Sequence, residues 1–152
     1  MNYLNAINFG SSMLKKSSLK SHLLESELLL AESLNSNREN ILIKLDKKLD
    51  FKNYYYFKKL LARRKRKEPI AQILKKKEFW SLNFYVNKDV LIPRPSSEII
   101  VEETLKLIGL NSKKKILDVG TGSGCLIVSI INERPKCNGI AIDISKKAIK
   151  VA

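Results

Sequence analysis

The chain has 152 residues, of which 44% are hydrophobic and 29% are charged, and its formal charge at pH 7 is +14. This balance is typical of a folded globular protein, and no apolar run approaches the ~20 residues that a membrane-spanning helix needs. Two cysteines and one histidine are too few for a disulfide framework or a cysteine–histidine metal site. Because the N-terminus also lacks a signal-peptide pattern, we expect a cytoplasmic protein that binds no membrane and no metal.

Residues 1–67 predict a small helical bundle. Apolar residues recur at three- and four-residue spacings from Leu19 to Leu34, which is typical of an amphipathic helix. The stretch from Ser36 to Glu39 has the form of a capping box and predicts a second, short helix after it. Further helices are expected from Tyr54 to Arg66 and near Tyr3 to Lys16.

The pattern changes its period after Pro69, which ends the helical region because a proline has no N–H to donate. Apolar residues then alternate from Leu82 to Val86, and a turn at residues 87–89 leads to Val90–Ile92. These features predict a β-hairpin. We therefore assign residues 68–93 to a linker that contains a hairpin.

Residues 94–152 alternate between helical and strand patterns. The expected elements are a helix from Ser96 to Ile108 capped by Ser96 or Ser97, a strand Lys115–Val119, a helix Cys125–Glu133, a strand Gly139–Ile142 and a helix that opens at Ser145. This order is typical of the start of a doubly wound α/β domain. The predicted fold class is α + α/β: a helical bundle, a hairpin linker and an incomplete Rossmann-like domain.

The segment ILDVGTGSGC, residues 116–125, is a strand that runs into a loop of three glycines. Such a loop brings a ligand against the peptide N–H groups at the start of the next helix. A carboxylate at the end of the following strand can accept both hydroxyl hydrogens of a ribose, and Asp143 stands there. The sequence therefore predicts a site for an adenosine-bearing cofactor, formed by Gly120, Thr121, Gly122, Ser123, Gly124 and Asp143.

The spacing of the glycines bears on which cofactor this is. The loop reads G-x-G-x-G, whereas the loop that holds a dinucleotide pyrophosphate reads G-x-G-x-x-G. S-adenosylmethionine has no phosphate, and Asp118 before the glycines suits its methionyl ammonium group. The spacing thus favours a methyltransferase over a dehydrogenase, and a glycine turn without a ligand is the remaining alternative.

Three runs of basic residues, 63–67, 75–77 and 113–115, contribute to the positive charge. A charge of this size favours polyanions, so RNA or an RNA-rich partner such as the ribosome is one interpretation. Consecutive residues of a helix point in all directions, and no aromatic residues interleave with these runs as a platform for a single strand requires. We therefore interpret the runs first as solvated surface.

Several segments, taken in order, resemble the HemK/PrmC family, the protein-(glutamine-N5) methyltransferases that act on peptide chain release factors. They are Glu25–Ala31, Leu61–Arg64, Glu68–Leu74, Glu78–Trp80, Val90–Glu98 and the ILDVGTGSGC loop. The resemblance implies S-adenosylmethionine-dependent methylation of the glutamine in the Gly-Gly-Gln tripeptide of release factors, in translation termination. It also implies that residues 1–67 form a release-factor-binding domain. We expect a monomer that has release factors as partners and works near the ribosome.

The segment Pro93–Glu98 departs from this family. It reads PRPSSE where the family usually reads PRPETE, so one acidic group is lost. The resemblance implies that Arg94 and Glu98 lie near the cofactor pocket, and a structural clamp between domains is an equally good role for them. Two glycines that the family pattern expects, before Pro69 and after Leu74, are Glu68 and Lys75 here.

The family's catalytic motif, Asn-Pro-Pro-Tyr, does not occur in the 152 residues. That motif orients the glutamine amide, whose delocalised lone pair makes it a poor nucleophile, so we assign no catalytic residue. We expect the chain to be the N-terminal part of such an enzyme and to lack activity alone. Two alternatives stay open: a methyltransferase for a ribosomal protein glutamine, and a non-catalytic module that binds a release factor or RNA.

Overall fold

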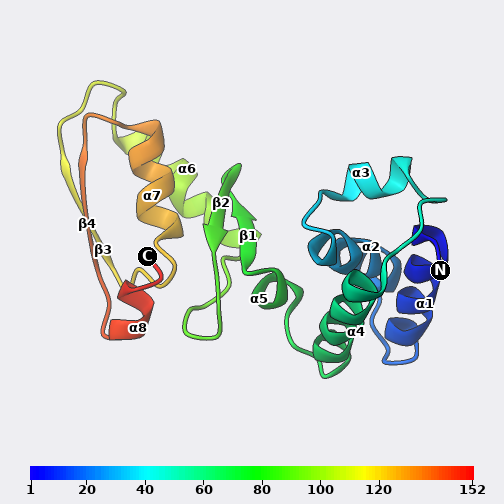
Figure 1. Cartoon of the computed structure of the whole chain (residues 1–152). Coiled ribbons are helices and arrows are strands. Elements are labelled where there is room, and N and C mark those ends of the chain that lie inside the picture. Colours follow the sequence, from blue (N-terminus) through cyan, green and yellow to red (C-terminus); the bar gives the residue numbers. More distant parts are fainter. The chain divides into compact units, whose positions relative to one another are not determined.

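The structure is a computed structural model that describes residues 1–152. It divides into two compact units, a helical unit Met1–Leu74 and an α/β unit Lys75–Ala152 (Figure 1). The predicted fold class is confirmed, because helices alone build the first unit and a hairpin followed by a parallel strand pair with helices builds the second. No helix is long and apolar enough to cross a membrane.

The helical unit contains five helices: α1 (Tyr3–Lys15), α2 (His22–Ser33), α3 (Arg38–Ile43), α4 (Phe51–Lys65) and α5 (Ile70–Leu74). The four predicted helices are confirmed, but three begin elsewhere. The helix expected from Leu19 is α2, which begins at His22. The side chain of Asp50 accepts the N–H of Asn53 at 2.8 Å, so α4 begins three residues earlier than expected. The cap of α3 is Asn37 and not Ser36. Helix α5 follows Pro69 and was not predicted.

Helices α1, α2 and α4 pack around one apolar core. Gly10 lies where these three helices meet, since a Cβ there would be 2.3 Å from Ser26 Oγ and 2.8 Å from Phe57 Cζ. The buried hydroxyl of Ser26 donates to the carbonyl of Ile7 at 2.8 Å, which ties α2 to α1. The buried apolar residues of this core are Tyr3, Ala6, Ile7, Leu14, Leu29, Leu30, Ala31, Ile41, Leu49, Phe57, Leu60, Leu61 and Ile73.

A carboxylate of α2 joins it to α4. Glu25 accepts two hydrogen bonds from Arg64, at 2.7 Å from Nε and 3.0 Å from Nη2, and both side chains are mostly buried. A planar guanidinium matches a carboxylate in this two-bond geometry, which fixes the direction of the contact. Glu27 accepts a single hydrogen bond from Nε of Arg38 of α3 at 2.6 Å, so two of the three acids of α2 pair with arginines of neighbouring helices.

The α/β unit begins with a hairpin, β1 (Lys76–Phe79) and β2 (Leu82–Tyr85), and continues through a 3-10 turn at Pro95–Ser97 into α6 (Glu98–Leu107). The remaining elements are β3 (Lys115–Val119), α7 (Cys125–Glu133), β4 (Asn138–Ile142) and α8 (Lys146–Ile149). The boundaries predicted for β3 and α7 are confirmed at both ends, and β4 begins one residue earlier than predicted. Ser97 is the N-cap residue of α6, which was one of the two predicted positions, but its side chain makes no cap hydrogen bond.

The hairpin is present, but its predicted turn at residues 87–89 is wrong. The turn is Trp80–Ser81, with Phe79 paired to Leu82, and Val90–Ile92 forms no strand. Both turn residues have left-handed backbone angles, φ 50° and φ 56°. A two-residue turn needs such angles to match the twist of its strands, and Asn-Gly usually supplies them. Trp80 and Ser81 carry no such signal, which is why the turn was missed.

Strands β3 and β4 are parallel neighbours, and α7 contacts both strands and α6 (Figure 1). Gly139 allows the close approach of β4 to α7, because a Cβ there would lie 2.9 Å from side-chain carbons of Ile127 and Ile131. A second apolar core joins the hairpin to α6 and α7 through Phe79, Phe84, Val101, Cys125 and Ile130. Apolar side chains of both strands remain exposed, among them Leu117, Val119, Ile140 and Ile142.

Candidate functional site

The carboxyl ends of β3 and β4 lie side by side, because Val119 pairs with Ile142 in a parallel register. The chain leaves β3 through the glycine loop, residues 120–124. The N–H groups of Gly120 and Thr121 both donate to the carbonyl of Ile142, at 2.8 and 3.0 Å. The loop is therefore fastened to the end of the neighbouring strand, the edge at which open α/β sheets bind their ligands.

The three glycines of the loop have left-handed backbone angles, with φ of 79° at Gly120, 56° at Gly122 and 76° at Gly124. These angles favour glycine over any residue with a side chain. A Cβ added at Gly120 or Gly122 would meet no atom of the chain within 4 Å. The space beside both residues is thus open, and a ligand could approach the backbone there.

Asp143 follows β4 directly, and its carboxylate binds the glycine loop. Its Oδ2 accepts the N–H of Gly122 at 2.9 Å, and its Oδ1 accepts the N–H of Ser145 at 2.8 Å. The hydrogen bonds from Ser145 and Gly122 lower the pKa of this carboxyl below its ordinary value. Asp143 is therefore ionised at neutral pH and held in place, and each oxygen keeps capacity for a further donor.

Two further polar groups of the loop are bound to each other. The hydroxyl of Thr121 donates to Oδ2 of Asp118 at 2.7 Å, which orients the carboxylate at the end of β3. Thr121 and Ser123 are both buried. The loop therefore offers a ligand mainly its backbone, together with the carboxylates of Asp118 and Asp143.

The structure brings together all six residues predicted to hold a cofactor, Gly120 to Gly124 and Asp143, at one edge of the strand pair. Gly124 precedes the first turn of α7 and donates its N–H to the carbonyl of Thr121 at 2.9 Å. Cys125, the first residue of α7, is buried, and this burial raises the pKa of its thiol. No group of three metal-ligating side chains exists in the chain.

Glu98 has a structural task within the α/β unit. Its Oε1 accepts the backbone N–H of Trp80 at 2.9 Å, while the indole Nε1 of Trp80 donates to Glu133 at 3.1 Å. Two carboxylates from α6 and α7 thus hold the hairpin turn in its left-handed conformation. Sequence reasoning assigned Glu98 to the cofactor pocket or to a clamp, and it missed Trp80 and Glu133. Arg94 is exposed and forms no ion pair.

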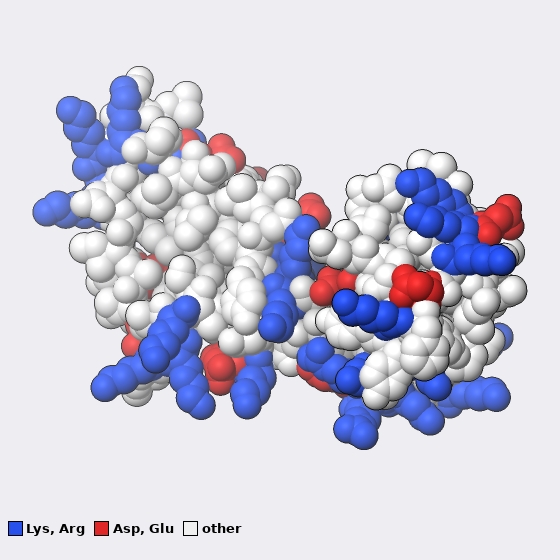
Figure 2. All heavy atoms as spheres, in the orientation of Figure 1, with Lys and Arg blue, Asp and Glu red and all other residues white.

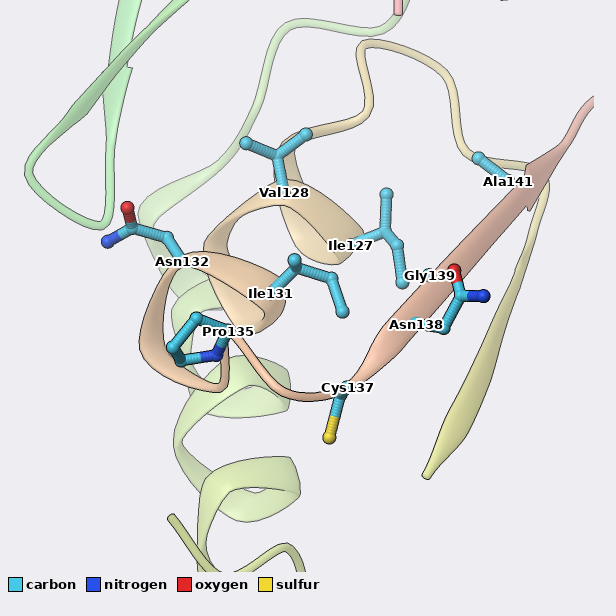
Figure 3. Close-up of a pocket in the computed structure, with 9 residues that line it drawn as sticks. All are labelled: Ile127, Val128, Ile131, Asn132, Pro135, Cys137, Asn138, Gly139 and Ala141. Carbon is cyan, nitrogen blue, oxygen red and sulfur yellow. The ribbon is translucent and has the colours of Figure 1, made fainter. Parts of the chain in front are cut away.

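A hollow lies elsewhere, along α7 and β4 (Figure 3). It measures about 610 Å³, and Ile127, Ile131 and Pro135 are among its lining residues. None of the predicted cofactor residues lines it. Its lining has no carboxylate, histidine or lysine, and Cys137 is its only ionisable side chain.

Two family models match the chain. The PrmC N-terminal domain matches residues 5–74, and a methyltransferase domain matches residues 110–152. The first match covers the helical unit, and the second contains the glycine loop and Asp143.

Curated proteins of bacteria are similar over almost the whole chain. A release factor glutamine methyltransferase of Buchnera aphidicola is 40% identical over 152 residues, which is 100% of this chain and 54% of that protein. One of Shewanella oneidensis is 37% identical, with 97% of this chain and 51% of that protein covered. A protein named bifunctional methyltransferase of Rickettsia typhi is 40% identical over 96% of this chain and 32% of its own length. The chain thus spans between about a third and about half the length of these relatives.

Proposed function

Because the chain belongs to the HemK/PrmC family, we propose that its protein transfers a methyl group from S-adenosylmethionine to the side-chain amide of a glutamine in peptide chain release factors. This proposal is supported by two features that occur together in this chain. A PrmC N-terminal domain precedes a glycine loop that is fastened, with Asp143, at the carboxyl ends of two parallel strands.

The residues at this edge fit S-adenosylmethionine. Open space beside Gly120 and Gly122 leaves room for the cofactor against the loop. Asp143 is ionised and fixed by two backbone bonds, and its remaining acceptor capacity suits a ribose diol. Asp118, oriented by Thr121, suits the methionyl ammonium group. The sulfonium of the bound cofactor supplies an electrophilic methyl group.

The glutamine amide must be oriented towards that methyl group, because its lone pair is delocalised. No Asn-Pro-Pro-Tyr occurs among the 152 residues, so the groups that perform this orientation are not assigned to this chain. The helical unit is the proposed docking surface for the release factor. The proposed setting is the cytoplasm, with the protein acting as a monomer near the ribosome.

The cofactor half of the proposal is tested by ligand-detected NMR on the 152-residue chain. S-adenosylmethionine should bind weakly, with a Kd of about 1 mM, and NAD should not bind at the same concentration. Asp143→Ala should abolish the signal, whereas Lys88→Ala in the same unit should leave it unchanged. Binding of NAD in preference to S-adenosylmethionine would refute the assignment.

The substrate half is tested with the protein encoded by the whole gene in which this sequence lies. Radiolabelled methyl groups from S-adenosylmethionine should appear on a recombinant release factor, and mass spectrometry should locate them on the glutamine of Gly-Gly-Gln. A release factor with alanine in place of that glutamine is the control. Transfer to the control at an equal rate, or to no glutamine at all, would overturn the proposal.

A further inference from the structure

Helix α4 has an unusual composition for a surface helix. Residues Phe51–Lys65 contain six lysines and arginines and no carboxylate. Three large aromatic side chains of this helix also face solvent: Phe51 is 82% exposed, Tyr55 54% and Tyr56 43%. Exposed aromatic and cationic groups therefore occur together on one helix.

Their spacing places several of them in one stripe. Phe51, Tyr55, Lys59 and Arg66 follow one another at intervals of four, four and seven residues, and side chains at such intervals share a helix face. Lys59 Nζ lies 4.6 Å from the centroid of the Tyr55 ring, which shows that cation and ring are direct neighbours. We call these four residues, with Lys52 beside them, the α4 stripe.

No carboxylate of the protein pairs with the cations of the α4 stripe. Arg63 and Arg64 of the same helix are bound to Glu68 and Glu25, whereas Lys52, Lys59 and Arg66 form no ion pair. Interaction with the helix dipole does not account for them all, because Lys52 lies in the first turn, where a positive charge is unfavourable. A solvated surface accounts for the lysines but not for the exposed rings between them.

More cations adjoin the C-terminal end of the stripe. Lys67 donates to the carbonyl of Ser17, so the end of α4 meets the turn that follows α1. Lys15 at the end of α1 and Lys16 and Lys20 after it have exposed side chains. Lysines and arginines gather at this lower end of the helical unit, where α1 and α4 end (Figure 2).

We propose that the α4 stripe binds single-stranded RNA, with Lys52, Lys59 and Arg66 on its phosphates and bases stacked on Phe51 and Tyr55. Aromatic platforms interleaved with cations are the features with which proteins hold single strands without reading their sequence. Phe, Tyr and Arg are enriched at protein interfaces too, but lysine is depleted there, so Lys52 and Lys59 favour RNA over a protein partner. The choice of RNA over DNA rests on the proposed function in translation.

The length of the α4 stripe and its three cations determine how many nucleotides it can bind and how strongly salt should weaken the binding. Phe51 and Arg66 are fifteen residues apart, which corresponds to about 22 Å of helix, enough for a few nucleotides. Three phosphate contacts predict that log K falls with log salt with a slope of about −2 on a single strand. Stacking needs unpaired bases, so duplex RNA of equal length should bind several-fold more weakly.

The test is fluorescence anisotropy with a labelled oligouridine of about 12 nucleotides and the full 152-residue chain, without S-adenosylmethionine. Phe51→Ala with Tyr55→Ala should weaken binding about tenfold or more. Lys52→Gln, Lys59→Gln and Arg66→Gln together should weaken it and reduce the salt slope by about 2. The matched control carries the same charge change in the α/β unit, Lys113→Gln, Lys114→Gln and Lys115→Gln, and should bind within twofold of the unchanged chain.

All substituted side chains are exposed, and far-UV circular dichroism verifies that each variant is folded. Equal losses in the stripe and control variants would mean that net charge alone attracts RNA, and the proposal would be overturned. Undiminished binding by the aromatic variant, or equal affinity for duplex RNA, would overturn it as well. The proposal would also be overturned by a variant of the α4 stripe that no longer binds a release factor but still binds RNA. Because no methyl transfer is measured, a negative result leaves the proposed enzymatic function standing.

Discussion

Replacing Gly10 by alanine tests the packing of the helical unit. A glycine inside a helix costs about 1 kcal/mol relative to alanine, so helix propensity alone predicts that Gly10→Ala stabilises the protein. The structure predicts the opposite. The new methyl group would lie 2.3 Å from Ser26 Oγ, 2.8 Å from Phe57 Cζ and 3.1 Å from Leu61 Cδ2, three buried neighbours from two helices.

The magnitude follows from these contacts. Overpacking a close-packed core costs about 1–3 kcal/mol. If Ser26 moves aside, its hydrogen bond to the carbonyl of Ile7 is lost at a further cost of about 1 kcal/mol. After subtraction of the gain in helix propensity, the free energy of unfolding should fall by about 1–3 kcal/mol. For a unit of this size, 2 kcal/mol corresponds to a fall in Tm of ~8–16 °C.

Thermal and urea unfolding followed by far-UV circular dichroism measure this change. Gly109→Ala is the matched control, because a Cβ at Gly109 meets no atom within 4 Å, and it should alter stability by less than about 0.5 kcal/mol. Ser26→Ala should destabilise the unchanged chain by about 1 kcal/mol but be less harmful when combined with Gly10→Ala. Stabilisation by Gly10→Ala, or additive effects in the double variant, would refute the packing argument.

Other substitutions examine the α/β unit. Lys75 has φ 54°, so Lys75→Gly should stabilise the protein by about 1 kcal/mol in urea unfolding, and a loss of stability would contradict this. Glu98→Ala should lower stability by about 1–2 kcal/mol and disturb Trp80 fluorescence, while Glu98→Gln, which keeps an acceptor, should be milder. The pKa of Asp143 is lowered by its bonds, so the loop should keep its full stability above about pH 4 and lose this contribution as pH falls through the lowered pKa. NMR of the loop amides checks this, and Asp143→Asn should remove the transition. The Cys125 thiol is buried with a raised pKa, so iodoacetamide at neutral pH should label it only after denaturant is added.

The elements that were predicted correctly carry strong local signals. Strand β3 is a short apolar run that ends in glycines, and α7 is an apolar stretch that begins directly after them. The hairpin turn was misplaced because its support is not local. Trp80 is held by Glu98 and Glu133, which are 18 and 53 residues away along the chain. No rule that reads neighbouring residues can detect such partners.

The same distinction applies to the segments that carry the family resemblance. Glu25 and Arg64 belong to two of these segments and are separated by 39 residues, yet they form a bidentate ion pair. The resemblance identified both segments, but it did not predict that Glu25 and Arg64 are in contact. Lys75 likewise takes the left-handed backbone that the expected glycine would have provided, a strain that becomes visible only in the structure.

The bond between Asp143 and the loop illustrates what spacing can and cannot predict. A loop after one parallel strand and an acid after the next must meet at the same sheet edge, so their proximity was predictable. The engagement of both carboxylate oxygens by backbone N–H groups was not. Whether a carboxylate is already bound depends on the turn after the strand, which the sequence pattern leaves undefined.

The division of the chain at Leu74 has a consequence for its biosynthesis. Every residue of the core of the helical unit lies before that point, so this core is complete while the second half is still being translated. Helical bundles fold in microseconds to milliseconds, whereas a ribosome adds about 5–20 residues per second. The bundle thus has several seconds to fold before the parallel strands emerge from the ribosome. Its apolar core contains no residue of those strands, so it can form without them.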